Sequence, residues 1–256
     1  MGIKSGISGT QSIQRALALL QLIADNQAGG LRFTGICLLS GLERSTAHRL
    51  LACLVEEGYM EKDYSSKQYR LGVKCIQLGL SATYKTPLVE ACYPTLLRLT
   101  RLTNDTVFLI IRHGDLSFCI AREVSASRTK PIVTDIGKSR LLGIGPAGLA
   151  LLAAMPDSEV EDIVRRRKQE YEQIGFKPNR IEKIIQKTRK NGFSETHNTI
   201  TFGVSGVGCA FSISPKANVA ISIAAANERL PPSRCETIGA LLLKESHSLQ
   251  EMFVGR

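Results

Sequence analysis

Residues 31–71 constrain the fold more than any other part of the chain. They contain a short apolar stretch, Phe33–Ser40, then Gly41, then a longer stretch at residues 43–57. Both stretches have helical periodicity, and the glycine favours a turn between them. A polar hairpin follows at residues 59–71. This order predicts a winged helix-turn-helix, in which the second helix fits the major groove of DNA and the wing lies beside it.

The longer helical stretch has an apolar face and a polar face at 100° per residue. The apolar face contains Ala47, Leu50, Leu51 and Leu54. The opposite face contains Ser45, His48, Arg49 and Ala52. We therefore expect one face to pack in a core and the other to be exposed, with small and hydrogen-bonding groups near the start of the helix.

Eight side chains are candidates for DNA contacts. Those expected to face base edges are Ser45, Thr46, His48 and Arg49. Those expected to contact phosphates are Arg15, Arg44, Lys67 and Arg70. The alternative is a helical hairpin that merely packs, with His48 and Arg49 as ordinary surface residues. The hairpin directly downstream favours DNA binding over this alternative.

The remaining segments predict a second domain. We expect a winged helix-turn-helix domain over residues 1–72, a linker helix over 73–83 and a further domain over 84–256, beginning near Tyr84. Helices are expected at residues 11–25, 87–102, 147–154, 158–171, 178–191 and 232–252, and strands at 106–112, 117–122, 203–212 and 217–225. Strands and helices do not alternate strictly, so we predict an α+β domain with a mixed sheet.

The charge balance agrees with an acidic partner but does not locate it. The net charge is +10, yet residues 1–83 carry only nine Lys and Arg against six acids. Much of the excess lies later, in the run from Arg165 to Lys168 and in residues 183–190. These runs lie in helical stretches with interspersed glutamates, so we interpret them as solvated faces and not as DNA contacts.

The cysteines and histidines show no metal or disulfide pattern. Seven cysteines without a Cys-x-x-Cys spacing, most of them in apolar windows (Cys53, Cys75, Cys119, Cys209), are interpreted as reduced core residues. The four histidines are scattered. No signal segment or membrane-length apolar run is found, so we expect a cytoplasmic protein without cofactor or metal.

Two motifs come close to catalytic signatures without matching them. Residues 143–148 have the Gly-x-Gly-x-x-Gly spacing of dinucleotide sites, but helices follow where a second parallel strand is required. The helix that starts near Ala147 would instead suit a carboxylate. Ser205 lacks the Gly-x-Ser-x-Gly spacing of a nucleophile elbow, and we interpret it as a strand or loop residue. No catalytic residue is assigned.

Three N-terminal segments, residues 11–20, 45–54 and 68–72, resemble the IclR family of bacterial transcriptional regulators. The resemblance continues through weaker marks at residues 104–107, 137–140, 148–153, 191–193 and 221–223. It implies an N-terminal winged helix, a linker helix, and a GAF-like α+β domain that senses a small molecule. It also implies homodimers, or dimers of dimers, on palindromic operators.

The resemblance also implies an effector site. Its residues would be Gly143, Gly145, Pro146, Ala147, Gly148, Val204, Gly206, Ser222 and Ala224. Several positions depart from the family pattern: Gly206 stands where many members have a cysteine, Ala224 replaces a serine, and Leu141, Gly143 and Leu149 replace Pro, His and Lys. The site is therefore expected to be less polar, which favours a larger organic acid such as an aromatic carboxylate.

The sequence as a whole predicts a regulator, of repressor type, that binds operator DNA and responds to a small organic acid. One alternative is an architectural DNA-binding protein that ignores small molecules. Another is an enzyme built on the second domain, but the sequence contains no paired acid and base or nucleophile motif that would support it.

Overall fold

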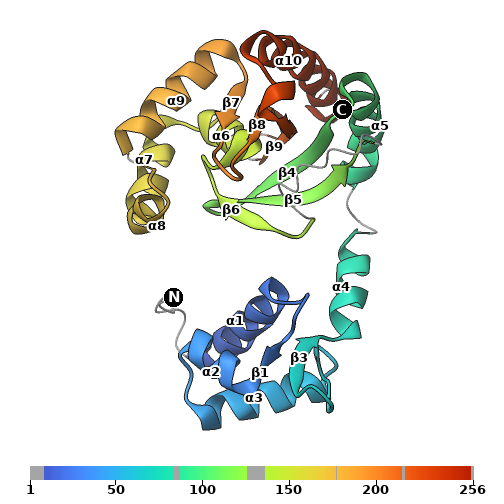
Figure 1. The fold of residues 1–256 in the computed structure, drawn as a ribbon, viewed down its shortest axis with the longest axis vertical. Helices are drawn as coiled ribbons and strands as arrows, with labels where there is room; N and C mark the ends of the chain where they lie inside the picture. The colour runs from blue at the N-terminus through green and yellow to red at the C-terminus, as the bar shows by residue number, and fades with distance from the viewer. Residues whose placement is uncertain (1–8, 84–86, 126–135, 177, 215–216, 255–256) are drawn as a thin grey trace. The chain divides into compact units, whose positions relative to one another are not determined.

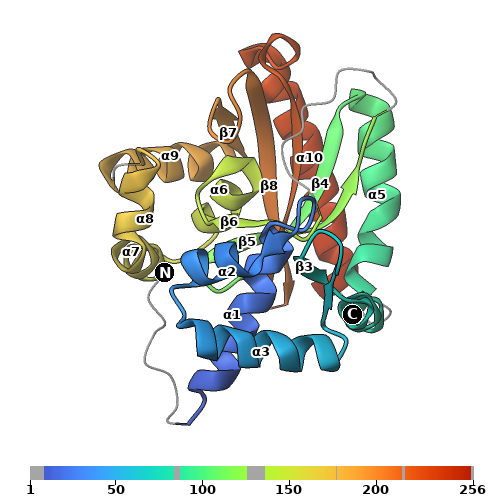
Figure 2. The same ribbon diagram turned by 60° about the horizontal axis from the view of Figure 1, so that its bottom comes forward.

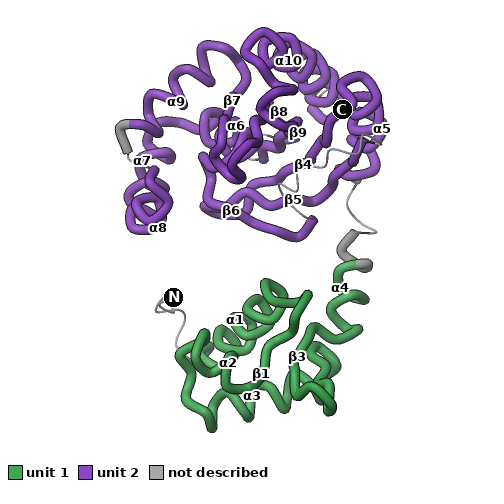
Figure 3. Tube along the Cα trace, in the orientation of Figure 1, with its two compact units in different colours: residues 1–86 green, residues 87–256 purple. Residues whose placement is uncertain are grey.

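The computed structural model describes residues 9–83, 87–125, 136–176, 178–214 and 217–254. The chain divides into two compact units, residues 1–86 and residues 87–256 (Figure 3). Tyr84, the predicted start of the second domain, lies outside the described residues.

The first unit is a winged helix-turn-helix, as predicted (Figure 1). Its helices are α1 (Gln11–Asp25), α2 (Phe33–Ser40), α3 (Arg44–Glu56) and α4 (Val73–Thr83). Its strands are β1 (Leu31–Arg32), β2 (Met60–Lys62) and β3 (Gln68–Leu71), which form an antiparallel sheet in the order β1-β3-β2. The sequence analysis did not predict β1, because two residues are too few to show an alternating pattern.

The predicted apolar face of α3 packs into the core of this unit. Ala47, Leu51 and Leu54 are buried, and Leu50 is half-buried. They join a core that also contains Leu19, Ile23, Ile36, Met60 and Tyr69. Gly41 ends α2 with φ of 67°, a left-handed conformation that glycine adopts without strain. The burial of one side of α3 leaves its polar side outward.

The second unit is an α+β domain, as predicted, built on a six-stranded sheet. Its strands, in the order β6-β5-β4-β9-β8-β7, are β4 (Thr106–His113), β5 (Leu116–Glu123), β6 (Ser139–Leu141), β7 (Ser194–His197), β8 (Val204–Ser214) and β9 (Ala217–Ala226). Neighbouring strands of this sheet in the described chain are all antiparallel. The predicted mixture of parallel and antiparallel strands is therefore wrong.

Helices cover both faces of this sheet (Figure 2). One face packs against α5 (Pro87–Thr103) and α10 (Pro232–Val254), and the other against α6 (Gly145–Ala153). Along β4, Val107 and Leu109 belong to the first of these cores, whereas Phe108 and Ile110 belong to the second. This alternation follows from the two-residue period of a strand that is buried on both sides.

The remaining helices extend the α6 side of the domain: α7 (Asp157–Arg166), α8 (Lys168–Gln173) and α9 (Pro178–Asn191). The single helix predicted over residues 158–171 is therefore two helices, interrupted at Arg167. A 3-10 turn, η1 (Asn227–Arg229), joins β9 to α10. Among the described residues, no helix combines the length and apolarity that crossing a membrane requires.

All seven cysteines are free thiols. Cys92, Cys119, Cys209 and Cys235 are buried, and burial raises the pKa of the Cys92 thiol to about 12. Cys53 is exposed, so its assignment to the core is wrong. Its direction on α3 lies roughly 100° from the centre of the stripe formed by Ala47, Leu50, Leu51 and Leu54.

Candidate DNA-binding face and effector cavity

The outward face of α3 carries the side chains predicted to meet base edges. Ser45, His48 and Arg49 are exposed, and Thr46 is half-buried. Arg49 makes no hydrogen bond or ion pair with the residues that the structure describes. A guanidinium that is exposed and unpaired can reach the acceptor groups of a guanine in the major groove.

Two of the predicted contacts are positioned by the same aromatic ring. The Arg44 guanidinium lies 5.2 Å from the centre of the Phe33 ring. The His48 ring meets Phe33 edge-on, with centroids 6.1 Å apart and planes at 79°. Phe33 starts α2, so this contact fixes the N-terminal turn of α3 against α2 and holds both polar groups at the protein surface.

The wing is stabilised by a turn around Asp63. Its Oδ1 accepts hydrogen bonds from Ser65 N at 2.8 Å, from Ser65 Oγ at 2.6 Å and from Ser66 N at 3.2 Å. These hydrogen bonds hold the pKa of the Asp63 carboxyl well below its usual range. The bond from the Ser65 side chain contributes most. Lys67 follows with φ of 59°, and both Lys67 and Arg70 are exposed. The wing therefore presents two cations beside α3.

Arg15 on α1 differs from the other predicted phosphate contacts. It is half-buried, and its Nε is buried without a hydrogen-bond partner among the described residues.

A cavity opens in the second unit between the sheet and the start of α6. Its volume is about 430 Å³, mouth included. It is lined by Phe108, Ile110, Ser117, Cys119, Lys138, Arg140, Ile144, Gly145, Pro146, Ala147, Gly148, Ile200, Ser222 and Ala224. These residues include two cations and no acid, and burial lowers the pKa of the Arg140 guanidinium. The site therefore suits an apolar molecule with a negatively charged group.

The start of α6 adds polar groups to this cavity. The first-turn amides belong to Gly145 and Ala147, because Pro146 has no N–H. The Ser222 side chain is only 3% exposed, and it makes no hydrogen bond with the described residues. A buried hydroxyl that lines a cavity without a partner is a ready hydrogen-bonding group for a ligand.

The predicted effector residues fall into three groups. Gly145, Pro146, Ala147, Gly148, Ser222 and Ala224 line the large cavity. Val204 and Gly206 line a smaller hollow of about 210 Å³, mouth included, which Pro146 and Ala224 also line. Gly143 lines neither, and its N–H donates to Gly148 O at 2.9 Å, which ties the loop before α6 to the second turn of that helix.

Sequence reasoning missed most of the side chains that give the large cavity its character. Phe108, Ser117, Cys119, Arg140 and Ile200 come from strands and loops that meet only in the fold. For Arg140 the sequence did contain a signal. Segment 137–140, already noted for its resemblance to the family, contains Arg140 and the neighbouring lining residue Lys138.

Gly206 and Gly208 of β8 allow α6 to approach the sheet closely. A Cβ on Gly206 would lie 2.7 Å from Pro146 Cγ, and a Cβ on Gly208 would lie 2.7 Å from Pro146 C and O. Ser194 Oγ, which is buried, donates to Pro146 O at 2.6 Å. The Pro146 ring thus occupies the space that a side chain at position 206 would need.

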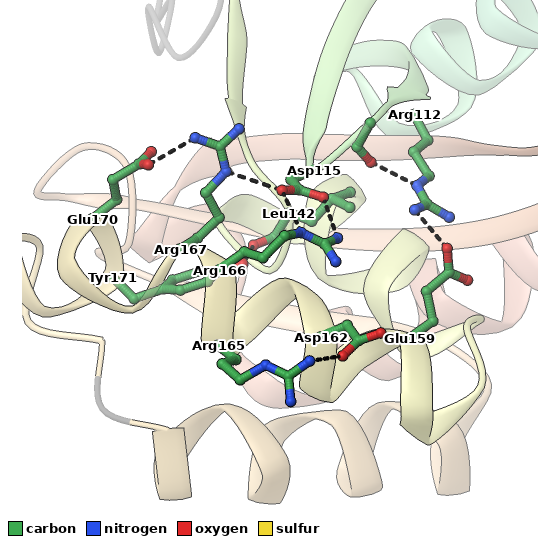
Figure 4. Close-up of polar contacts among 11 residues, drawn as sticks. Arg112, Asp115, Leu142, Glu159, Asp162, Arg165, Arg166, Arg167, Glu170 and Tyr171 are labelled. Atoms are coloured by element: carbon green, nitrogen blue, oxygen red, sulfur yellow. Dashed lines mark hydrogen bonds and ion pairs between the residues drawn. The ribbon is translucent and has the colours of Figure 1, made fainter. Parts of the chain in front are cut away.

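An ion-pair network fixes the loop that leads into the cavity (Figure 4). Asp115 accepts from Arg166 at 2.8 Å and from Arg167 at 3.0 Å, and these contacts lower the pKa of its carboxyl. Asp115 O also accepts from Leu142 N at 3.0 Å. Tyr171 Oη donates to Leu142 O at 2.7 Å, so both backbone groups of Leu142 are held.

Ser205 belongs to a hydrogen-bonded group at the edge of the sheet. Its Oγ pairs with His197 Nδ1 at 2.7 Å and donates to Asn227 Oδ1 at 2.6 Å. Ser205 as a whole is only 2% exposed, and its hydroxyl proton points to the Asn227 amide oxygen. This arrangement supports a structural role for Ser205 in joining β7, β8 and η1.

A winged helix with an exposed, unpaired arginine, in one chain with an α+β domain that carries an open cavity with two cations in its lining, is the arrangement of a DNA-binding regulator with a second domain for a small molecule. A family model for the "Bacterial transcriptional regulator IclR C-terminal" matches residues 80–250, and one for the "IclR helix-turn-helix domain" matches residues 12–63. The chain belongs to the IclR family of bacterial transcriptional regulators.

Individual relatives agree with this assignment. The chain is 24% identical over 249 residues to the transcriptional repressor IclR of Escherichia coli, covering 96% of this chain and 90% of that protein. An IclR family regulator from Brucella abortus has the same fold, with a TM-score of 0.83, 19% identity and coverage of 98% and 96%. An IclR homologue from Microbacterium hydrocarbonoxydans, crystallised with 4-hydroxybenzoate, has a TM-score of 0.73 at 14% identity, with coverage of 94% and 100%. The relatives are named regulators and repressors, and the chain is a regulator and not an enzyme.

Proposed function

We propose that the protein binds operator DNA in the cytoplasm as a homodimer or a dimer of dimers, and that a small organic acid modulates this binding. The observation that carries the proposal is the outward face of α3, where Arg49 is exposed and unpaired beside a wing with two further cations.

Base readout is assigned to α3. Arg49 would bind guanine O6 and N7, and Ser45, Thr46 and His48 would meet neighbouring base edges. Phosphate contacts are assigned to Arg44, Lys67, Arg70 and Arg15. The Phe33 contacts hold Arg44 and His48 before DNA binds, which reduces the side-chain entropy lost on binding.

Exposed apolar side chains on the first unit support self-association. Ile13 and Leu17 of α1 are 61% and 59% exposed, and Val73, Ile76 and Leu78 of α4 are 55%, 63% and 53% exposed. Such side chains commonly mark protein interfaces. Two copies joined there would present two α3 helices to half-sites about one turn of DNA apart.

The large cavity is the proposed effector site, with the smaller one beside it. An aromatic carboxylate would place its ring near Phe108 and Ile110, and its charge near Arg140 and the first turn of α6. Gly143 would act on the site through its hydrogen bond to Gly148 of α6. The homologue crystallised with 4-hydroxybenzoate supports this ligand class.

The helix α4 is proposed as the linker, residues 73–83, between a DNA-binding domain over residues 1–72 and an effector domain over 84–256. Ligand binding would bias the arrangement of two winged helices in a dimer through α4. Coupling of this kind is typically worth about 1 to 3 kcal/mol.

Two measurements test the proposal. Selection from a random-sequence duplex library should yield a palindromic site, and its binding should be weakened by Arg49→Ala. Thermal unfolding should then be followed with 4-hydroxybenzoate, benzoate, pyruvate and glyoxylate. A ligand at 100 times its Kd adds about 2.7 kcal/mol to the free energy of unfolding. Absence of any selected sequence would refute operator binding, and stabilisation by glyoxylate or pyruvate but not by benzoates would refute the aromatic acid.

A further inference from the structure

The two cavities of the second unit are adjacent, and the three residues that they share form the partition between them. Both are lined by Pro146, Ile200 and Ala224. Pro146 and Ala224 belong to α6 and β9, where they pack in the core. Ile200 alone comes from the segment between β7 and β8, and its side chain is only half-buried. It is therefore the part of the partition that can change without disturbing the sheet.

Ile200 can pack against the start of α6 because Gly145 has no side chain there. Gly145 has φ of 72°, and a Cβ added there would overlap Ile200 Cδ1. The isoleucine thus lies directly on the first turn of α6, where the proposed carboxylate site begins. Its position is set by contact with backbone and not by a flexible neighbour.

The loop that carries Ile200 is tied at both ends. Asn198 N donates to Val204 O at 2.9 Å, and Gly203 N donates to Asn198 Oδ1 at 2.8 Å. Asn227 Nδ2 donates to the same Asn198 oxygen at 2.9 Å, and its Oδ1 accepts from Ser205. Because these bonds close the loop on itself and on η1, the partition is a fixed wall in this structure.

The chambers on the two sides of this wall differ in chemistry. The large one contains Lys138 and Arg140, which suit a carboxylate. The small one contains hydroxyl groups of Thr196, Thr199 and Thr201, and no charged residue among its lining. A ligand that reached through the wall would therefore keep its acid in the first chamber and place an uncharged tail in the second.

We propose that Ile200 determines the length of the effector. It confines ligands to the large cavity, and its removal joins the two chambers so that acids with a longer tail are accepted. This inference rests on the proposed effector function of the large cavity.

The test is isothermal titration of the full-length protein with 4-hydroxybenzoate, 4-ethoxybenzoate and 4-butoxybenzoate. In the unmodified protein, binding should weaken from the ethoxy to the butoxy compound. In Ile200→Ala the order should reverse, because each additional buried methylene tightens binding about fourfold, which gives about 15-fold for two. Ile200→Val, which removes one methyl group, should shift the preference part of the way and serves if Ile200→Ala fails to fold.

The matched control is Ile144→Ala, because Ile144 lines the large cavity and not the small one. It should change the affinity for all three compounds by similar factors and keep their order. An unchanged order in both Ile200 variants, or a reversal in Ile144→Ala, would overturn the role of Ile200 while leaving the effector site intact. If the unmodified protein binds none of the three compounds, the aromatic-acid function fails, and the length rule fails with it.

Discussion

Two groups of basic residues in this molecule differ both in their density along the sequence and in their partners. On α3 and the wing, Arg49, Lys67 and Arg70 make no ion pair within the described chain. On α7 and α8, each residue from Arg165 to Lys168 is paired with an acid: Asp162, Asp115, Glu170 or Glu172.

Pairing, and not the density of positive charge, is therefore the criterion by which we assign the surface proposed to bind phosphate. The run at 165–168 is the densest basic run of the chain, yet its charge is used to hold α7 and α8 to the turn after β4. The sparse cations of α3 and the wing make no ion pair within the described chain, so they remain available to neutralise phosphates and release counterions from DNA.

The largest expected effect is that of Arg49→Ala on operator DNA. Loss of a bidentate contact to guanine should cost roughly 1 to 3 kcal/mol and relax the preference at one base position. Fluorescence anisotropy at fixed salt, with the selected duplex and single-base variants of it, measures both. Arg165→Ala, which removes a paired arginine, is the control and should leave the affinity unchanged. Equal losses of DNA affinity in the two variants would show that pairing does not distinguish the two groups of basic residues.

Asp115→Asn tests the paired group directly. Replacing the charged acceptor should lower the free energy of unfolding by about 2 kcal/mol, because hydrogen bonds to ionised groups are the stronger ones. The contacts from Arg166 and Arg167 lower the pKa of this carboxyl, so its stabilisation is present above the ordinary carboxyl pKa. It is lost as the pH falls through the lowered value.

Denaturant titrations of both proteins between pH 3 and pH 7 measure this effect. The difference between them should shrink towards acid pH. Asp162→Asn is the control, because its pair with Arg165 is exposed and should contribute less than about 1 kcal/mol. A constant difference across the range would show that Asp115 acts through its shape and not through its charge.

Lys67→Asn should weaken all duplexes about equally. Asparagine tolerates the left-handed backbone found at Lys67, so the charge is removed with little strain. Loss of one phosphate contact should cost about 1 kcal/mol and reduce the slope of log K against log salt by about 1. Lys168→Gln, at a paired position, provides the control. A change in sequence preference would place Lys67 in base readout instead.

The smallest effect concerns the turn of the wing. Hydrogen bonds from Ser65 and Ser66 lower the pKa of Asp63, so the carboxylate in the folded turn stays ionised below the ordinary carboxyl pKa and is protonated only as the pH reaches the lowered value. Amide chemical shifts of Ser65 and Ser66, followed by NMR from pH 7 downward, should stay constant through pH 4. In Asp63→Asn they should not titrate at all. An ordinary titration midpoint in the unmodified protein would contradict the turn geometry.

The long helices and the wing could be predicted from sequence because their periodicity is local. Three strands could not: β1, β6 and β7 have two to four residues each, and β7 reads Ser-Glu-Thr-His, without an apolar alternation. Their pairing energy comes from partners distant in the chain. Cys53 was misplaced for a related reason, since an apolar window does not reveal which side of a helix is buried.

The candidate sites divide in the same way. The exposed side of α3 follows from one helix and its period, so Ser45, His48 and Arg49 could be identified as outward-facing. The cavity is assembled from β4, β5, β6, α6, β9 and three loops. Arg140 and Ile200 therefore come close to the start of α6 only when the chain folds, and no local sequence pattern predicts this.

Because the Pro146 ring packs directly against Gly206, the substitutions that one of these positions accepts depend on the residue at the other. A mutation that gives position 206 a side chain while Pro146 is present would wedge α6 away from β8, and selection would remove it. Loss of the proline would remove the 2.7 Å contact, and the Ile223 carbonyl oxygen, 3.1 Å from such a Cβ, would remain close. The residue at position 146 therefore sets how much room a side chain at position 206 would find.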